Sequence, residues 1–253
     1  MDIHGISAIV TGGASGLGAA TARLLGKQGA KVAVFDMNND LGEQVAAEIG
    51  GAFFAVNVAD EENVAAAIAA AEAAHGVARI LVNCAGIGTA RKTVDREGKP
   101  HPLAGFRKVI EVNLIGSFNV LAQFAARLST AETVGEGRGV AVNTASVAAF
   151  DGQIGQAAYS ASKGGIVGMT LPVARDLAQY GIRVVTIAPG LFMTPMMAGF
   201  SPEVQQSLAQ TVLFPQRLGK PEEFAELVAA ICIQTMLNGE TIRLDGALRM
   251  APK

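Results

Sequence analysis

Seven short runs rich in β-branched residues alternate with alanine-rich helical stretches along the whole chain. The runs lie at 6–10, 31–36, 53–58, 80–83, 140–144, 183–188 and 241–244. Strands that are each followed by a helix pair in parallel, and helices then cover both faces of the sheet. The alternation predicts an α/β fold, a doubly wound domain with a seven-stranded, mostly parallel sheet.

Composition narrows the class of protein further. The 253 residues carry 20 Lys and Arg against 22 Asp and Glu, a net charge of −2, which offers no long-range attraction to nucleic acid. Half of the residues are hydrophobic and 17% are charged, which suits a chain with a large core. No Pro/Ser-rich linker divides the sequence, so we expect one domain over 1–253.

Several features favour a cytoplasmic protein without membrane spans or metal. The longest charge-free stretch, 184–202, contains three prolines that would break a spanning helix, and the N-terminus shows no signal-peptide pattern. Cys84 and Cys232 lie in separate apolar segments, as reduced core thiols do. The three histidines lie in unrelated segments, so we expect no metal site.

A glycine-rich turn, TGGASGLG at 11–18, separates the first predicted strand from a helix. Gly12 permits a tight turn and Gly16 lets a pyrophosphate approach the backbone, while the N–H groups at the start of the helix attract its charge. Strand, turn and helix together predict a Rossmann-like dinucleotide site. Its candidate cofactor-binding residues are Gly12, Ser15, Gly16, Leu17 and Gly18.

Asp36 ends the second predicted strand, about 24 residues after Gly12, near the spacing of a carboxylate that binds the adenosine ribose. Such a carboxylate accepts hydrogen bonds from the ribose hydroxyls and repels a 2′-phosphate. We therefore expect NAD rather than NADP as the cofactor.

A long helix is predicted over 106–128, where apolar residues recur at helical intervals on one face. Asn113 interrupts that apolar face, so its amide must be buried and hydrogen-bonded. The pattern alone leaves two interpretations open, a core amide that fixes packing and a functional side chain.

Tyr159 and Lys163 lie four residues apart, which places a phenol and an ammonium side by side on a helix. A fixed cation stabilises phenolate and would lower the pKa of Tyr159 toward the working pH. Ser146 follows the strand at 140–144, where its hydroxyl can hydrogen-bond a carbonyl oxygen that gains charge. A Tyr-x-x-x-Lys pair by itself is also typical of a solvated helix surface.

The order of these motifs resembles the short-chain dehydrogenase/reductase family over essentially the whole chain. The motifs are TGGASGLG at 11–18, Asn83-Cys84-Ala85-Gly86, Asn113, Ser146, Tyr159, Lys163 and Pro189-Gly190. The resemblance implies a catalytic tetrad of Asn113, Ser146, Tyr159 and Lys163, in which Asn113 holds a water in a proton relay from Lys163 to solvent.

The same resemblance implies further cofactor contacts. Lys163 would bind the nicotinamide ribose and lower the Tyr159 pKa, while Thr194 would anchor the carboxamide. Asn57 replaces the Asp that family members usually place before Val58, and its amide oxygen can still accept from the adenine amino group. The full set of implied cofactor residues is Asn57, Val58, Asn83, Cys84, Ala85, Gly86, Tyr159, Lys163, Pro189, Gly190, Phe192 and Thr194.

A Met- and Phe-rich segment follows Gly190, and we expect it to form an apolar substrate lid over about 190–220. An ordinary packed pair of helices is the alternative. Two polar insertions, 88–103 and 129–139, resemble the 3-hydroxyacyl-CoA dehydrogenase type II branch, whose members also oxidise hydroxysteroids. That branch implies that Gln153, besides Ser146 and Tyr159, contacts the substrate, that Phe192 contacts the cofactor, and that the protein is a homotetramer.

Three functions are consistent with these features. The first is an NAD-dependent oxidoreductase that interconverts a secondary alcohol and a ketone, 3-hydroxyacyl-CoA or a hydroxysteroid. The second is a 3-oxoacyl-carrier-protein reductase, which Asp36 disfavours because biosynthetic reduction generally uses NADPH. The third is a catalytically idle dinucleotide-binding scaffold, which the intact tetrad disfavours. The first insertion carries Arg91, Lys92, Arg96 and Lys99, which either receive the phosphates of CoA or are simply solvated.

Overall fold

The computed structural model describes residues 2–252, with only the backbone of Met196. Within this range the seven strands form one sheet in the order β3-β2-β1-β4-β5-β6-β7, and every neighbouring pair is parallel. The strands are β1 Ser7–Thr11, β2 Lys31–Asp36, β3 Ala52–Ala55, β4 Ile80–Asn83, β5 Gly139–Thr144, β6 Ile182–Pro189 and β7 Thr241–Leu244. The predicted α/β class and doubly wound sheet are confirmed.

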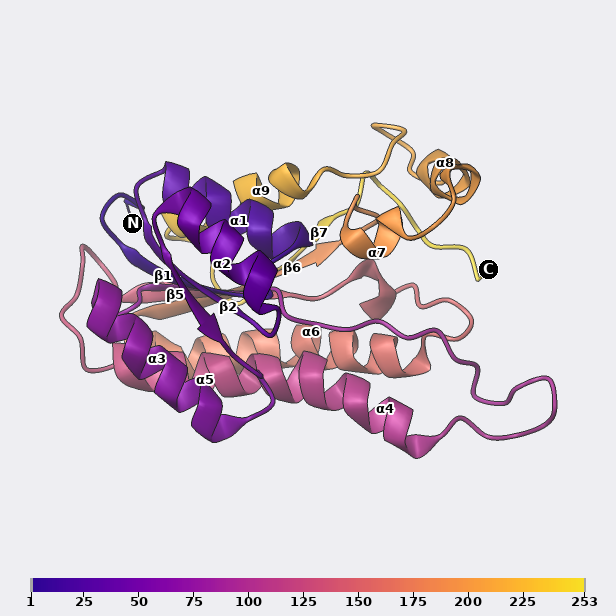
Figure 1. Cartoon of the computed structure of the whole chain (residues 1–253), viewed down its shortest axis with the longest axis horizontal. Coiled ribbons are helices and arrows are strands. Elements are labelled where there is room, and N and C mark those ends of the chain that lie inside the picture. Colours follow the sequence, from indigo (N-terminus) through magenta and orange to yellow (C-terminus); the bar gives the residue numbers. More distant parts are fainter. Residues whose placement is uncertain (1, 253) are drawn as a thin grey trace.

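Helices cover both faces of this sheet (Figure 1). One face carries α1 Gly16–Lys27, α2 Asn39–Ile49 and α9 Pro221–Ile233, and the other carries α3 Glu61–His75, α5 Gly116–Leu128 and α6 Ala157–Ala178. Adjacent strand residues serve opposite faces: Val10 packs in the core with Leu25 and Phe224, while Ile9 packs in the second core with Phe124. The hydrophobic runs of the central strands follow from this burial on both sides.

The third strand is shorter than the predicted run at 53–58. It ends at Ala55, although Val56 and Val58 are buried. The chain turns at Asn57, whose Oδ1 accepts from the Ala59 backbone N at 3.2 Å, and Asp60 then caps α3 by accepting from Asn63 N at 2.9 Å. This local side-chain bonding ends the strand, because it gives the backbone an alternative to the sheet.

The long helix begins at Leu103, after Pro102, and continues to Leu128 through a π-helical turn. Its parts are α4 Leu103–Ile110, the π turn η1 Glu111–Ile115 and α5, so the regular helix predicted over 106–128 is interrupted at Asn113. By length and composition alone this helix could cross a membrane, but 44% of its most apolar window is buried inside the fold. The absence of a membrane span stays a prediction.

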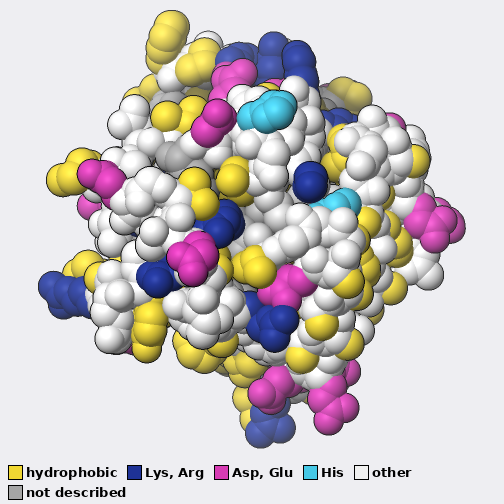
Figure 2. Space-filling model, turned by 90° about the vertical axis from the view of Figure 1, so that its left-hand side faces the viewer, with side chains coloured by type: hydrophobic (Ala, Val, Ile, Leu, Met, Phe, Trp, Pro, Cys, Tyr) yellow, Lys and Arg dark blue, Asp and Glu magenta, His cyan; other side chains and the backbone are white. Residues whose placement is uncertain are grey.

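Strand order determines where a site can form. The sheet extends from β1 toward β2 in one direction and toward β4 in the other, and this switch point leaves a crevice at the carboxyl ends of the strands. Figure 1 shows the loop between β4 and α4, the helices α7 Pro195–Ala198 and α8 Pro202–Gln210, and the C-terminus at one end of the molecule. At the other end, acidic and basic side chains are interspersed (Figure 2).

Candidate active site

The turn between β1 and α1 is built so that no side chain fills it. Gly12 and Gly16 have φ values of +63° and +53°, which favour glycine, and a Cβ on Gly12 would lie 2.7 Å from the backbone N of Ala85. A Cβ on Gly18 would collide with the Gly12 carbonyl oxygen. The Ser15 side chain makes no capping hydrogen bond, and the first turn of α1 holds no acidic residue. This cradle fits the pyrophosphate of a dinucleotide, because free N–H groups and a positive helix end face it.

Asp36 lies at the end of β2 with its carboxylate fixed beside that cradle. Its Oδ2 accepts from Ala14 N at 3.1 Å and its Oδ1 accepts from Asn38 N at 2.9 Å. Each oxygen keeps a further lone pair for a ribose hydroxyl. The structure thus places a negative charge next to the glycine turn, as the sequence predicts.

The side chains of two other residues predicted to lie on the adenine side, Asn57 and Asn83, make hydrogen bonds within the protein. Asn57 Oδ1, the expected acceptor, is held by Ala59 N, which leaves one lone pair of that oxygen. The Asn83 side chain points into the sheet, where Nδ2 donates at 3.0 Å both to Ser117 O and to Asn143 Oδ1. The Asn83 side chain is therefore engaged within the fold, and the cofactor contacts of 83–86 stay predictions.

Cys84 is a buried thiol rather than a reactive one. Thr144 Oγ1 donates to its Sγ at 3.5 Å, and burial raises the pKa of the thiol to about 11. Burial likewise raises the pKa of Cys232 to about 12. A thiol with so high a pKa is mostly protonated near neutral pH and is a poor nucleophile.

The segment after β6 returns to the glycine turn. Thr194 begins α7 and lies against Gly16, since a Cβ on Gly16 would meet the Thr194 side chain at 3.6 Å. Gly190 lies against Asp245, where a Cβ would come within 2.8 Å of the Asp245 Cβ. Phe192 differs from expectation, because its side chain is buried in the core and packs against Gly219. The Phe192 ring packs under this segment on the core side, and a contact of Phe192 with the cofactor stays a prediction.

Ser146, Tyr159 and Lys163 are brought together beside the carboxyl end of β5. Ser146 precedes the short helix η2 Val147–Ala149, and its Oγ accepts from Ala148 N at 3.1 Å. The Tyr159 hydroxyl makes a side-chain hydrogen bond with Ser146. Lys163 lies one turn further along α6, with its Nζ 5.8 Å from the centroid of the Tyr159 ring. The predicted convergence of these three groups is therefore seen in the structure.

The electrostatics of the pair differ from the sequence-based expectation. Burial raises the pKa of Tyr159, and only the hydrogen bond from Ser146 opposes this. The Nζ of Lys163 donates to the carbonyl oxygen of Thr144 at 2.7 Å, and its lowering of the Tyr159 pKa stays a prediction. Burial also lowers the pKa of Lys163 itself to about 8. The buried surroundings therefore disfavour the charged form of Lys163.

Asn113 is fully buried in the π turn, and its side-chain amide makes three hydrogen bonds. Oδ1 accepts from Ile87 N at 2.8 Å, while Nδ2 donates to Ile87 O at 2.9 Å and to Ser162 Oγ at 3.1 Å. The side chain therefore fastens the segment after β4 to α6. The packing role of the amide is therefore seen in the structure, while Oδ1 keeps one lone pair and the functional role of Asn113 stays a prediction.

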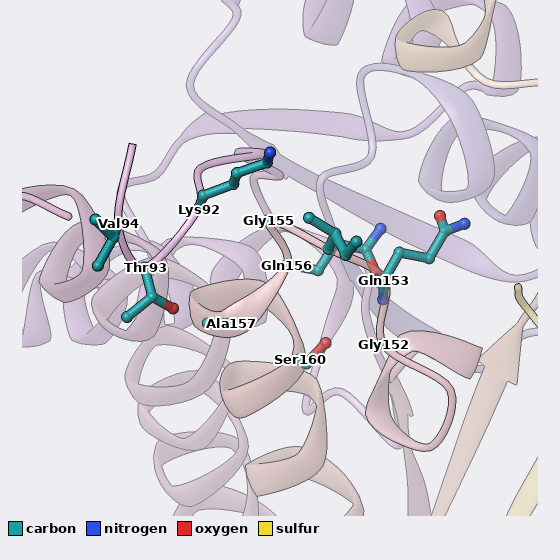
Figure 3. A pocket seen from close by; sticks show the side chains of 10 residues that line it. Lys92, Thr93, Val94, Gly152, Gln153, Gly155, Gln156, Ala157 and Ser160 are labelled. Atoms are coloured by element: carbon teal, nitrogen blue, oxygen red, sulfur yellow. Dashed lines mark hydrogen bonds between the residues drawn. The ribbon is translucent and has the colours of Figure 1, made fainter. Parts of the chain in front are cut away.

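The segment 152–157, which lies between Ser146 and Tyr159 in the sequence, forms one wall of a cavity of about 540 Å³ together with Ser160. Its opposite wall is Lys92, Thr93 and Val94 of the first insertion (Figure 3). Gln153 lies on this wall, but its Nε2 donates to the carbonyl oxygen of Ala251 at 2.9 Å. The side chain of Gln153, which is predicted to contact the substrate, is therefore hydrogen-bonded to the C-terminal segment.

The first insertion folds on itself as a short hairpin bridged between Val94 and Pro100. Lys99 forms an exposed ion pair with Glu97 at 2.6 Å, and Lys92 is the cation of the insertion that lines the cavity. The predicted lid carries exposed apolar side chains, with Leu213 70% and Phe214 83% exposed. The helix α8 buries none of its residues, unlike a packed helix pair.

Sequence reasoning missed several residues that build the site. Thr144 holds Lys163 through its backbone, and Ile87 holds Asn113 through both of its backbone polar groups. Backbone partners leave no pattern in a sequence. Arg243 pairs with Asp151 across 92 residues of sequence, a distance at which no spacing rule operates. No cluster of three or more metal-ligating side chains is found within residues 2–252.

Comparisons with known proteins place the chain in a family. The profile of the short chain dehydrogenase family matches residues 7–205. Human 3-hydroxyacyl-CoA dehydrogenase type-2 is 52% identical over 254 residues, which cover 99% of this chain and 97% of the human protein. A crystal structure of 3-hydroxyacyl-CoA dehydrogenase type-2 from Mycobacterium avium has a TM-score of 0.95 and 44% identity, with 98% of each chain covered.

A crystal structure of 3-ketoacyl-(acyl-carrier-protein) reductase from Brucella melitensis, in complex with NADH, is more distant. Its TM-score is 0.87 at 30% identity, with 98% of this chain and 100% of that chain covered. The chain accordingly belongs to the short-chain dehydrogenase family, as an oxidoreductase that acts on a small-molecule substrate with a nicotinamide dinucleotide cofactor.

Proposed function

We propose that this protein is an NAD-dependent dehydrogenase that interconverts a 3-hydroxyacyl-CoA and the corresponding 3-oxoacyl-CoA. The observation that carries the reaction type is the hydrogen-bonded Ser146 and Tyr159 pair with Lys163 one turn away, beside a glycine cradle without a side-chain cap. The substrate class is supported by the names of relatives that match nearly the full chain at more than half identity.

Each catalytic group has a task that follows from its chemistry. A bound nicotinamide supplies the hydride acceptor or donor. Tyr159 gives its hydroxyl proton to the carbonyl oxygen in reduction and takes it back in oxidation, while Ser146 donates a hydrogen bond to the same oxygen. Because burial raises the pKa of Tyr159, the phenol is protonated near neutral pH. Lys163 supplies a nearby cation that favours phenolate once its Nζ is drawn from Thr144 O.

Asp36 supports NAD over NADP. Its carboxylate is held by two backbone N–H groups at the end of β2, beside the turn that fits the pyrophosphate. A 2′-phosphate placed on the same ribose would meet a fixed like charge, and like charges in such positions cost several kcal/mol, on the order of a hundredfold in affinity or more.

The cavity between the first insertion and the 152–157 segment supports a substrate with a long polar arm. Its wall contains the side chains of Lys92, Gln153, Gln156 and Ser160. A CoA thioester has amides along its pantetheine arm and phosphates beyond them, which these groups can bind. Lys92 is the cation placed to receive a phosphate there, and a solvated side chain is the alternative.

We also propose a cytoplasmic homotetramer. Ile115 and Phe118 are about half exposed on the long helix, and a Cβ at Gly164 or Gly168 of α6 would meet open space. Such apolar and small residues are typical of helix faces that pack against a second copy. Cys84, which is partly buried, and Cys232, which is buried, form no disulfide, and this suits a reducing compartment. Size-exclusion chromatography with light scattering tests the homotetramer, and cell fractionation tests the cytoplasmic location.

The function is tested by assaying purified protein with NAD and with NADP against a substrate panel. The panel contains 3-hydroxybutyryl-CoA, its pantetheine and carrier-protein thioesters, a 17β-hydroxysteroid and a simple secondary alcohol. We expect the highest kcat/KM with NAD and the CoA thioester. A preference for the carrier-protein thioester with NADPH would favour the reductase alternative, and NADH binding without turnover of any substrate would favour the scaffold.

A further inference from the structure

Arg243 on β7 joins the loop after β5 to the segment that follows β7. Its Nη2 pairs with Asp151 Oδ2 at 2.6 Å and donates to Leu248 O at 2.9 Å, while its Nε pairs with Asp245 Oδ2 at 2.7 Å. The guanidinium also lies over the Phe150 ring, 5.2 Å from its centroid. The Arg243 side chain is only 21% exposed, so these bonds are shielded from solvent screening more than a surface pair is.

One of the joined segments is the loop 150–156, which connects the two hydroxyl-bearing residues of the site. Ser146 lies just before this loop and Tyr159 just after it, and its residues form one wall of the cavity in Figure 3. The chain's last residues attach the same loop a second time. Ile154 N donates to Pro252 O at 3.0 Å, and Gln153 Nε2 donates to Ala251 O at 2.9 Å.

Another joined segment lies on the cofactor side. Asp245 is in van der Waals contact with Gly190, and Gly190 N donates to Leu244 O at 2.9 Å. Through Asp245 and Asp151, Arg243 therefore spans from the turn that begins the lid to the loop that carries the substrate wall. A guanidinium can do this because its donors point in several fixed directions within one plane.

We propose that Arg243 is a positioning residue that sets the place of the loop 150–156, and with it the distance between Ser146 and Tyr159 and the width of the substrate cavity. It acts through Asp151, Phe150 and the C-terminal segment and does not touch substrate. The proposal rests on the proposed dehydrogenase function. Lysine is only a partial substitute, because a single ammonium cannot bond Asp151, Asp245 and Leu248 O together in this geometry.

The test compares Arg243→Met and Arg243→Lys with a matched control, Arg183→Met. Arg183 is also a partly buried arginine of this sheet, and it donates to the carbonyls of Leu237, Ile231 and Cys232 at the opposite end of β6. We expect Arg243→Met to raise KM for the substrate and lower kcat, each by about tenfold, since misplacement by about 1 Å can cost up to about a hundredfold. NADH affinity should change by less than about twofold, and Arg243→Lys should recover part of the loss.

Arg183→Met should lose thermal stability while its KM and kcat stay near those of the wild type. Asp151→Asn provides a second test if Arg243→Met does not fold, because it removes only the loop end of the pair. When Arg243→Met and Asp151→Asn are combined, their losses of kcat/KM should not add, as expected for residues that act through one interaction.

Wild-type KM and kcat in Arg243→Met or Asp151→Asn would overturn the proposal, as would the same kinetic loss in Arg183→Met. A wild-type protein that oxidises no alcohol would instead contradict the proposed function, so the two failures are distinguishable.

Discussion

The buried ammonium of Lys163 makes a quantitative prediction about stability. Its pKa is about 8, against 10.5 for an ordinary lysine, because burial penalises the charge. Keeping the group charged near pH 7 therefore costs the fold about 3 kcal/mol relative to a solvated lysine. Lys163→Met keeps a similar length and removes the titrating group.

The sign of the pH effect follows from the two pKa values. Between about pH 8 and 10.5 the unfolded chain still holds the lysine proton while the folded chain releases it, so stability rises with pH. From about pH 7 to about pH 9 the wild type should gain about 1 kcal/mol of unfolding free energy relative to Lys163→Met. Below about pH 7 both states are protonated, and the difference between the two proteins should be flat.

The assay is urea unfolding followed by circular dichroism, because the chain contains no Trp. Protein concentration is held constant, since an oligomer's stability depends on it. The thiols of Cys84 and Cys232 have raised pKa values, so they ionise first in the unfolded chain and lower stability above about pH 9. Both proteins contain these thiols, but Lys163 acts on the pKa of Cys84 in the wild type alone, so the comparison ends at about pH 9. A difference that stays flat or falls up to about pH 9 would refute the buried-charge argument.

Three further changes test the site. Tyr159→Phe should lower kcat by at least about a hundredfold with NADH affinity nearly unchanged, and near-normal turnover by this variant would remove Tyr159 from the mechanism. In the wild type, alcohol oxidation should become faster as pH rises, because burial raises the pKa of Tyr159 and oxidation needs the phenolate. Asp36→Ser should weaken NAD and admit NADP, and a wild type that already uses both equally would contradict the role of this carboxylate. Lys92→Ala should raise KM for a CoA thioester by about threefold or more. Lys99→Ala, which removes a paired cation of the same hairpin, should not change this KM. Equal effects of the two variants, or an equal rise of KM for a hydroxysteroid, would show that Lys92 is a solvated side chain without a role in binding CoA.

Sequence reasoning succeeded where a periodic pattern carries the information. The alternation of strand and helix patterns predicted the sheet, and the bounds of β2, β4 and β7 agree with the predicted runs. The glycine turn and Asp36 were found because positive φ and close approach restrict residue type at particular spacings. The spacing of Tyr159 and Lys163 correctly placed both on one face of a helix.

The failures share a physical cause, which is bonding between groups that lie far apart in sequence or on the backbone. The strand at 53–58 was too long because Asn57 bonds its own backbone. The hydrogen bond from Lys163 Nζ to the carbonyl oxygen of Thr144 was not predicted, because a backbone acceptor leaves no pattern in the sequence. The tie from Arg243 to Asp151 depends on how β7 and the loop after β5 meet in the fold, and neither local sequence indicates it.

Isotope transfer tests the central claim most directly. 3-Hydroxybutyryl-CoA with deuterium on the carbon that bears the hydroxyl is incubated with NAD and the wild-type protein, and products are analysed by mass spectrometry. The account predicts 3-oxobutyryl-CoA and an equal amount of reduced cofactor carrying one deuterium, with neither product from Tyr159→Phe above about one hundredth of the wild-type rate. Free CoA as the product, or reduced cofactor without deuterium, would contradict it.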